Sequence, residues 1–289
     1  MNDAQHLSNW GRWGADDQRG SLNLLTPELV KQAAGLVRTG KVYSLSMPLE
    51  ANGPQWPLRH KTWKVTSHRS VGTPNPGAAD DIVTLHSHSG THIDALCHYF
   101  YDNHIYNGYK ASDHITSQGI TRNAIDNVPA LVGRGVLLDV AAWKGVDNLQ
   151  LGEAISADDL DGCAAAQGTV IQPGDMVLVR TGWMRIFSEN RALYDSGEPG
   201  IDASALPWLQ AHDIVAIGAD NQAVEVLHSI PPDRLPVHEG AIRDLGIYLL
   251  ENLNLDALAA DQVYEFLLVV APLQLTGGAG SPINPIAIA

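Results

Sequence analysis

The chain has 289 residues, of which 45% are hydrophobic, and its 32 Asp and Glu against 18 Lys and Arg give a formal net charge of −14. This charge argues against a partner with a phosphate backbone, so we expect no nucleic acid binding. No run of about 18 apolar residues could span a membrane, and the first residues lack the basic and apolar regions of a signal peptide. We therefore expect a cytoplasmic protein without a membrane partner. One domain over residues 1–289 is predicted, because the length suits a single large core and no repeat or linker divides it.

The N-terminal part, residues 1–40, is predicted to be a polar arm followed by a helix. Thr26 supplies a capping hydroxyl and Pro27 suits the first helical position. Apolar residues then recur at helical spacing as far as Val37, and Gly40 is expected to end the helix.

Further along the chain, periodicity predicts alternating strands and helices. Ser156 and Asp159 form a capping box, and Gly168 is expected to end the helix that follows. Residues 68–81 are rich in glycine and proline and are expected to form a long functional loop, and the glycine-rich tail 277–282 is expected to be flexible and to return to the active site. The predicted strands are 42–47, 82–88, 135–140, 176–180, 214–218, 247–250 and 266–270, and the predicted later helices are one ending near residue 126, 160–166 and 205–211.

A dense cluster of metal-capable side chains lies between residues 86 and 98, and its members are His86, His88, His92, Asp94 and His98. On one helix, His88 and His92 would share a face while Asp94 and His98 would point elsewhere. On one extended strand, His88 and Asp94 would lie roughly 20 Å apart, whereas the ligands of one ion must lie about 2.0–2.2 Å from it. If three of them share an ion, the chain must bend, and Gly90 best permits this. We predict a strand that ends near His88, a turn at Gly90-Thr91, and a return that carries His92 and Asp94.

Two imidazoles and a carboxylate suit Zn²⁺ or Mn²⁺ and leave positions open for water or substrate. Such an ion lowers the pKa of bound water and polarises a carbonyl oxygen, and both effects serve hydrolysis. His98 is the candidate general base, and the alternative is that it is another ligand or a core histidine. Cys97 beside it is expected to be a small buried residue rather than a nucleophile.

Other metal-site patterns fit the cluster poorly. The metallo-β-lactamase pattern H-x-H-x-D-H fails because Gly90 and Thr91 stand where it needs Asp and His. The zincin pattern H-E-x-x-H does not occur in the sequence. An amidohydrolase barrel also begins with H-x-H, but the regular strand and helix alternation of a (β/α)₈ barrel is missing.

The segment from His88 to His98 resembles the H-x-G-T-H-x-D-x-P-x-H signature of the metal-dependent cyclase family, which includes bacterial kynurenine formamidases, isatin hydrolases and trans-dienelactone hydrolases. Leu96 replaces the usual proline, which would shape the turn rather than bind a ligand. The resemblance implies that His88, His92 and Asp94 bind the metal and that His98 acts as the base.

The resemblance extends from about Val42 to residue 289, and it implies further pocket residues. His238 and Glu251 would complete the pocket, since such residues help to hold a second zinc in formamidase-like members. For His238 the alternative is a helix-start histidine packed by prolines. His86 and Asp220 are additional candidates for a second metal or the pocket, and Gln55, Trp56 and Trp63 are candidates for substrate binding.

The family resemblance also implies an activity, a fold and an assembly. The expected function is metal-dependent hydrolysis of a C–N or C–O bond in a small cyclic amide or lactone. The alternatives are kynurenine formamidase proper and a non-catalytic metal-dependent binding protein. The expected fold is α/β, a swivelling β/β/α arrangement with a mixed and largely antiparallel sheet, assembled as a homodimer or homotetramer.

Overall fold

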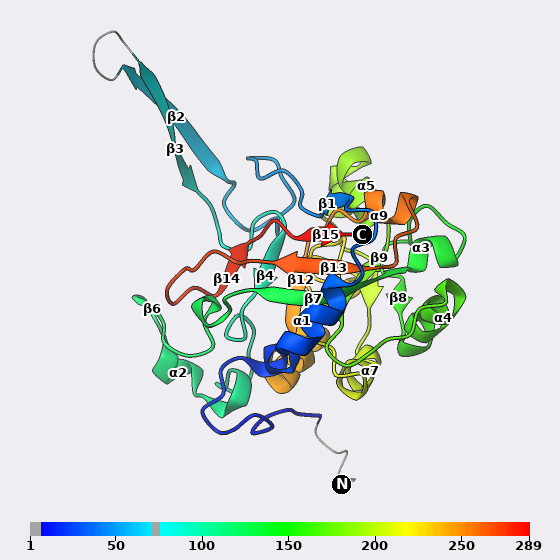
Figure 1. Ribbon diagram of the computed structural model, residues 1–289. Coiled ribbons are helices and arrows are strands. Elements are labelled where there is room, and N and C mark those ends of the chain that lie inside the picture. The colour runs from blue at the N-terminus through cyan, green and yellow to red at the C-terminus, as the bar shows by residue number, and fades with distance from the viewer. Residues whose placement is uncertain (1–6, 71–75) are drawn as a thin grey trace.

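A nine-stranded mixed sheet forms the centre of the molecule (Figure 1). The computed structural model describes residues 7–70 and 76–289. In spatial order the strands are β1 (Val42–Ser44), β15 (Ile286–Ile288), β13 (Glu265–Val270), β7 (Leu131–Asp139), β9 (Met176–Arg180), β11 (Ala216–Ala219), β12 (Tyr248–Glu251), β4 (His92–Asp94) and β14 (Gly280–Pro282). Strands β7, β9, β11 and β12 run parallel to one another, and the pairings on both sides of them are antiparallel. The predicted α/β class with a mixed sheet is confirmed, and the swivelling β/β/α arrangement stays a prediction.

Helices and short irregular segments cover the sheet on both faces. The helices are α1 (Pro27–Ala34), α2 (Ala111–His114), α3 (Val140–Trp143), α4 (Ala157–Gln167), α5 (Trp183–Glu189), α6 (Arg191–Tyr194), α7 (Ala205–Ala211), α8 (Pro236–His238) and α9 (Asp256–Ala260), with 3₁₀ turns η1 (Gly20–Leu24), η2 (Tyr106–Gly108) and η3 (Ile125–Asn127) and the π-helical η4 (Glu239–Leu245). Within the described ranges, none of the helices combines the length and the apolar character needed to cross a bilayer.

The core has two parts because successive side chains of each strand point to opposite faces. In β9, Val177 and Val179 pack with residues of α4, α7 and η4, while Met176 and Leu178 pack with residues of α9 and of the N-terminal segment. Nearly the whole of β9 is buried, as expected for a central parallel strand.

The local signals that rest on short-range chemistry are found where they were predicted. Thr26 caps α1 and Pro27 begins it, although the helix ends at Ala34, before the predicted Gly40. Ser156 and Asp159 form the predicted capping box of α4, and Gly168 ends that helix with a φ of 69°. The bounds of β9 and α7 match the predicted ranges 176–180 and 205–211.

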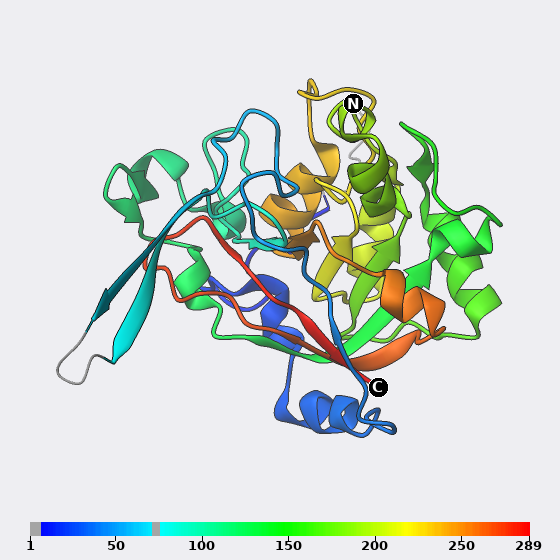
Figure 2. The same cartoon turned by 90° about the horizontal axis from the view of Figure 1, so that it is seen from above.

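The segment predicted as a long loop over residues 68–81 is instead largely a hairpin. Strand β2 (Trp63–Ser70) pairs antiparallel with β3 (Gly77–Thr84), and residues 71–75 lie outside the described residues. The hairpin extends away from the rest of the molecule in both views (Figures 1 and 2). The predicted strand over 82–88 is correct only for residues 82–84, because β3 ends at Thr84 and the chain turns before it reaches His88.

Two further predictions are wrong, one for the helix ending near residue 126 and one for the flexibility of the tail. In place of a helix ending near residue 126, the chain forms α2, the small hairpin of β5 (Ile115–Thr116) and β6 (Gly119–Ile120), and η3. The tail predicted as flexible is ordered as β14, which pairs with β4 and does return to the histidine cluster. The remaining short strands are β8 (Ala154–Ile155) and β10 (Gly200–Ile201), which pair in parallel.

Candidate metal centre

The predicted turn at Gly90-Thr91 is present and carries the chain into β4. Gly90 has a φ of 64°, a left-handed conformation that glycine adopts without strain. The Thr91 hydroxyl donates to the carbonyl of Asn252 at 2.6 Å, which ties the turn to the end of β12. Because β4 pairs antiparallel with β12 in the register that sets His92 opposite Glu251, a carboxylate from a distant part of the chain joins the cluster.

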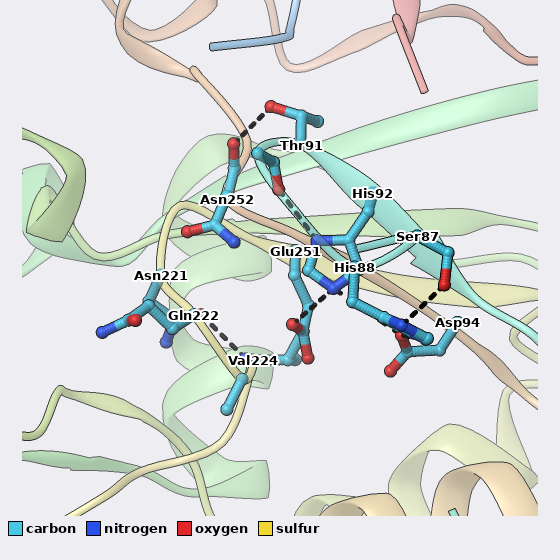
Figure 3. Close-up of polar contacts among 12 residues, drawn as sticks. Ser87, His88, Thr91, His92, Asp94, Asn221, Gln222, Val224, Glu251 and Asn252 are labelled. Carbon is cyan, nitrogen blue, oxygen red and sulfur yellow. Dashed lines mark hydrogen bonds and ion pairs between the residues drawn. The ribbon is translucent and has the colours of Figure 1, made fainter. Parts of the chain in front are cut away.

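The side chains of His88, His92 and Asp94 converge (Figure 3). The Nε2 atoms of His88 and His92 lie 3.3 and 3.7 Å from Asp94 Oδ1. Nδ1 of His92 faces the carbonyl of Gly90 at 2.8 Å, and Nδ1 of His88 faces the Ser87 hydroxyl at 3.0 Å. These contacts orient both rings so that Nε2 faces Asp94.

A second group lies on the other side of the Asp94 carboxylate. His238 Nε2 lies 3.2 Å from Glu251 Oε1 and 3.8 Å from Asp94 Oδ2. His238 Nδ1 lies 2.6 Å from Glu225 Oε1, and the backbone N–H groups of Val237 and His238 also donate to the Glu225 carboxylate. Glu225 therefore fixes the ring of His238 with Nε2 toward Glu251, an arrangement typical of metal-ligating histidines.

Several buried polar atoms at this centre have no hydrogen-bond partner among the residues that the structure describes. They are Nε2 of His88, Nε2 of His92, both carboxylate oxygens of Asp94 and Oε1 of Glu251. His92 Nε2 does approach Glu251 Oε2 to 2.9 Å, but as an ion pair without hydrogen-bond geometry. Buried polar groups are almost always paired, so converging orphan nitrogens and oxygens fit a divalent cation. Two donor groups are close enough to hold an ion, His88-Asp94-His98 and Asp94-His238-Glu251, and they share Asp94.

The protonation of these groups follows from burial and from their neighbours. Burial, helped by the nearby His98 and His92, holds the pKa of His88 well below its usual value, and burial also lowers the pKa of His98. Both rings are therefore neutral near pH 7, with a lone pair available for a metal or a proton. Burial alone would raise the pKa of Glu251, but the adjacent His92 and His238 lower it overall.

His98 lies at the edge of the cluster, on a pocket of about 220 Å³. Its ring stacks on that of His88 with centroids 3.9 Å apart, and it is only half-buried. The pocket is also lined by Trp56, Arg59, Tyr99, Gln222, Ala223, Leu235, His238 and Glu251. This position is open to a substrate and close to the donors. The geometry therefore suits His98 either as a general base or as a metal ligand.

The other predicted site residues are placed in different surroundings. Trp56 lines the pocket, whereas Trp63 lies on β2, is 53% exposed and does not line it. Gln55 uses its amide to accept from Ser89 and to donate to two backbone carbonyls. The structure does not bring Asp220 or His86 to the donors. The two Asp220 oxygens accept from Thr181 and Gly182, and exposed His86 accepts from the backbone N–H of His60.

Sequence reasoning missed Glu225 and Arg59. Glu225 follows the short strand β11 in an irregular stretch and carries no local motif, so its pairing with His238 is visible only in three dimensions. Arg59 donates from Nη1 to the carbonyl of His88 at 2.7 Å and lines the pocket. A cation beside a proline-rich stretch gives no sequence signal of its own.

Comparison with known proteins identifies relatives of this chain. Residues 43–226, more than half of the chain, match the family described as putative cyclase. An isatin hydrolase from Roseibium aggregatum is 28% identical over 233 residues, which cover 78% of this chain and 79% of that protein. A kynurenine formamidase from Geobacillus thermodenitrificans is 29% identical over 247 residues, covering 83% and 93% respectively.

Solved structures agree with the sequence comparison. A crystal structure of a novel cyclase superposes with a TM-score of 0.90 at 36% identity and covers 98% of both chains. An isatin hydrolase bound to the product analogue thioisatinate superposes with a TM-score of 0.63 at 24% identity, covering 90% of this chain and 95% of that chain, and shows the shared fold. The family match, together with the 36% identical structure, shows that this chain belongs to the cyclase family.

Proposed function

We propose that the protein is a metal-dependent hydrolase that opens a small cyclic amide or lactone. The observation that carries the proposal is the set of buried orphan nitrogens and oxygens around Asp94, beside a pocket that His98 also lines. The two named relatives, an isatin hydrolase and a kynurenine formamidase, are amide-bond hydrolases, which supports an enzyme of this class. The lactone half of the proposal rests on the family resemblance of the sequence.

His88, His92 and Asp94 would hold the metal, since both imidazole Nε2 atoms face Asp94 Oδ1. His238 and Glu251 would complete a second position with the same carboxylate. When bound, Zn²⁺ or Mn²⁺ supplies Lewis acidity and favours the ionised form of water. Nitrogen and oxygen donors accept both ions, so the donor set is compatible with either.

His98 would move the proton, since its lowered pKa leaves it neutral and able to accept one near pH 7. It takes a proton from water as the water oxygen adds to the carbonyl carbon. The C–N or C–O bond then breaks, and His98 returns the proton to the leaving nitrogen or oxygen. The hydrolysed substrate leaves as a carboxylic acid, which loses its proton to solvent near pH 7, with a free amine or alcohol.

Kynurenine formamidase proper is the second candidate. It is favoured by the relatives of that name, one of which aligns over 83% of this chain. The same donors and base would serve a formamide, because the bond broken is again C–N at a carbonyl.

We further propose that two copies of the chain associate through the β2–β3 hairpin. Register places Val65 opposite Ile82, and Trp63 lies two residues from Val65 on the same face. These three side chains are 53% (Trp63), 41% (Val65) and 63% (Ile82) exposed. A two-stranded hairpin with both faces in water is marginally stable on its own, so a partner for this apolar face is expected.

A second copy of the chain offers such a partner. A groove of about 340 Å³ at the base of the hairpin is lined mainly by apolar residues, among them Val83, Leu273, Leu275 and Pro282. Residues 59–84 carry four basic and two acidic side chains, which give them a charge of +2. Since the net charge of the chain is −14, all other residues together carry −16. The apolar, basic hairpin and the apolar groove at its base lie in a chain that is otherwise acidic, so two copies are complementary, and a two-fold dimer would use hairpin and groove twice.

The substrate class is tested with the purified metal-loaded protein on isatin, a lactone and N-formylkynurenine, before and after chelation. We expect hydrolysis of at least one compound that is lost with chelator and restored by Zn²⁺ or Mn²⁺. Bound metal with no turnover of any compound would instead favour the binding-protein alternative.

Replacing His98 by Ala is expected to leave the metal content unchanged and to lower kcat by about 10²- to 10⁴-fold, the usual contribution of a positioned acid or base. Metal analysis and kinetics are measured on the same preparation. Full activity of the metal-loaded variant would contradict the role as base, and loss of the metal would identify His98 as a ligand.

Gly280→Ala is expected to weaken metal binding by about 10- to 100-fold, as changes that displace a ligand do. A Cβ at this position would lie 2.5 Å from His88 Nε2 and 2.7 Å from the carbonyl oxygen of Ile93, and the backbone of β4 leaves no room to adjust. Zinc titration reports the affinity, with far-UV circular dichroism as the check on folding. An unchanged affinity in the folded variant would show that His88 is not a ligand.

Light scattering is expected to give the wild type at least twice the chain mass of 31.0 kDa. The double variant Trp63→Ser, Ile82→Ser should be smaller, because it removes the apolar face of the hairpin. Val146→Ser, at an exposed position elsewhere, should retain the wild-type mass. A monomeric wild type, or a double variant with unchanged mass, would rule out association through the hairpin.

A further inference from the structure

A second cavity, of about 510 Å³, adjoins the pocket at the metal centre. Arg59 lines both spaces, and Gln55, Lys61, Arg191 and Asp195 line the second one. The guanidinium of Arg59 therefore lies between the place where the proposed chemistry occurs and a larger space open to solvent.

The second cavity collects cations in a protein that is otherwise strongly acidic. Arg191 pairs with Asp195 at 2.8 Å. Among the described residues, by contrast, neither Arg59 nor Lys61 has a carboxylate within ion-pair distance, and Lys61 instead donates to the side chain of Asn52. Two cations without acidic partners at one cavity favour an anionic occupant.

Arg59 is equipped to bind such an occupant. The structure gives it one side-chain hydrogen bond, from Nη1 to the carbonyl of His88, so the remaining donors of its planar guanidinium stay available. A guanidinium of this kind matches a carboxylate in a two-point contact.

We propose that Arg59, with Lys61 behind it, forms a carboxylate subsite, and that the preferred substrates are small amides or esters carrying a carboxylate remote from the bond that is cleaved. This inference rests on the proposed hydrolase function. The scissile carbonyl lies at His98 and Glu251, and the anionic end of the substrate is held at Arg59 toward the second cavity.

A purely structural role for Arg59 has a different signature. If Arg59 only braced the carbonyl of His88, its loss would disturb the metal centre and impair every substrate alike. A carboxylate subsite affects only the substrate that carries the charge. A matched pair of substrates therefore separates the two roles.

The test compares formanilide with its 4-carboxylate, 4-formamidobenzoate, on the metal-loaded enzyme. Arg59→Met is expected to lower kcat/KM for the carboxylate about 10- to 100-fold more than for formanilide, mainly through KM, as expected for a lost hydrogen bond to a charged group. Lys61→Met should give a smaller shift in the same direction, and Arg59→Lys a partial recovery. Arg185→Met, which changes an exposed cation on α5 outside both cavities, should leave the ratio unchanged.

The outcomes distinguish this inference from the proposed function. Equal losses for both substrates, or a wild type that hydrolyses isatin or formanilide but not the carboxylate, would overturn the subsite and leave the hydrolase intact. If the metal-loaded wild type hydrolyses no compound at all, the proposed function fails and the subsite fails with it. Metal content is measured for every variant, so a loss of metal is not mistaken for a loss of substrate binding.

Discussion

The burial of the Asp94 carboxylate is the constraint on which the rest of the site depends. Both of its oxygens are buried without a hydrogen-bond partner in the described structure, in the middle of the two donor groups. Leaving buried carboxylate oxygens without partners costs several kcal/mol, which a bound cation would offset. The neighbouring residues also favour a cation at this position. Ser87, Gly90 and Glu225 orient the imidazoles of His88, His92 and His238, respectively, so that their Nε2 atoms face Asp94 or its neighbour Glu251.

The parts of the fold that follow from local chemistry could be predicted from the sequence. The capping box of α4, the bounds of β9 and the bend at Gly90 each depend on residues within a few positions of one another. The hairpin of residues 63–84 could not be predicted, because both faces of β3 are exposed and no apolar alternation marks it. The extension of a strand to His88 failed for a related reason, since evenly spaced histidines imitate a strand while the backbone in fact turns.

The residues of the site also divide into some that could be predicted from the sequence and others that could not. The cluster of His88, His92 and Asp94 is visible as spacing within seven residues of the sequence, and the structure brings these three side chains together. Glu225 and Arg59 reach the centre through contacts with residues 13 and 29 positions away, which no periodicity encodes. Asp220 shows the converse, because a buried acid after a strand looks available in the sequence, yet in the fold its oxygens are occupied by Thr181 and Gly182.

The pairing of β14 with β4 has a consequence for the order of folding. The donors on β4 lie between β12 and β14, whose residues follow them by more than 150 positions. Contacts between residues so far apart in sequence form late in folding, because the entropic cost of closing the loop between them must be overcome before they stabilise the fold. During synthesis the histidine cluster is made well before residues 280–282, with which β4 pairs. The centre can therefore be complete only after residues 280–282 have been made and have paired with β4.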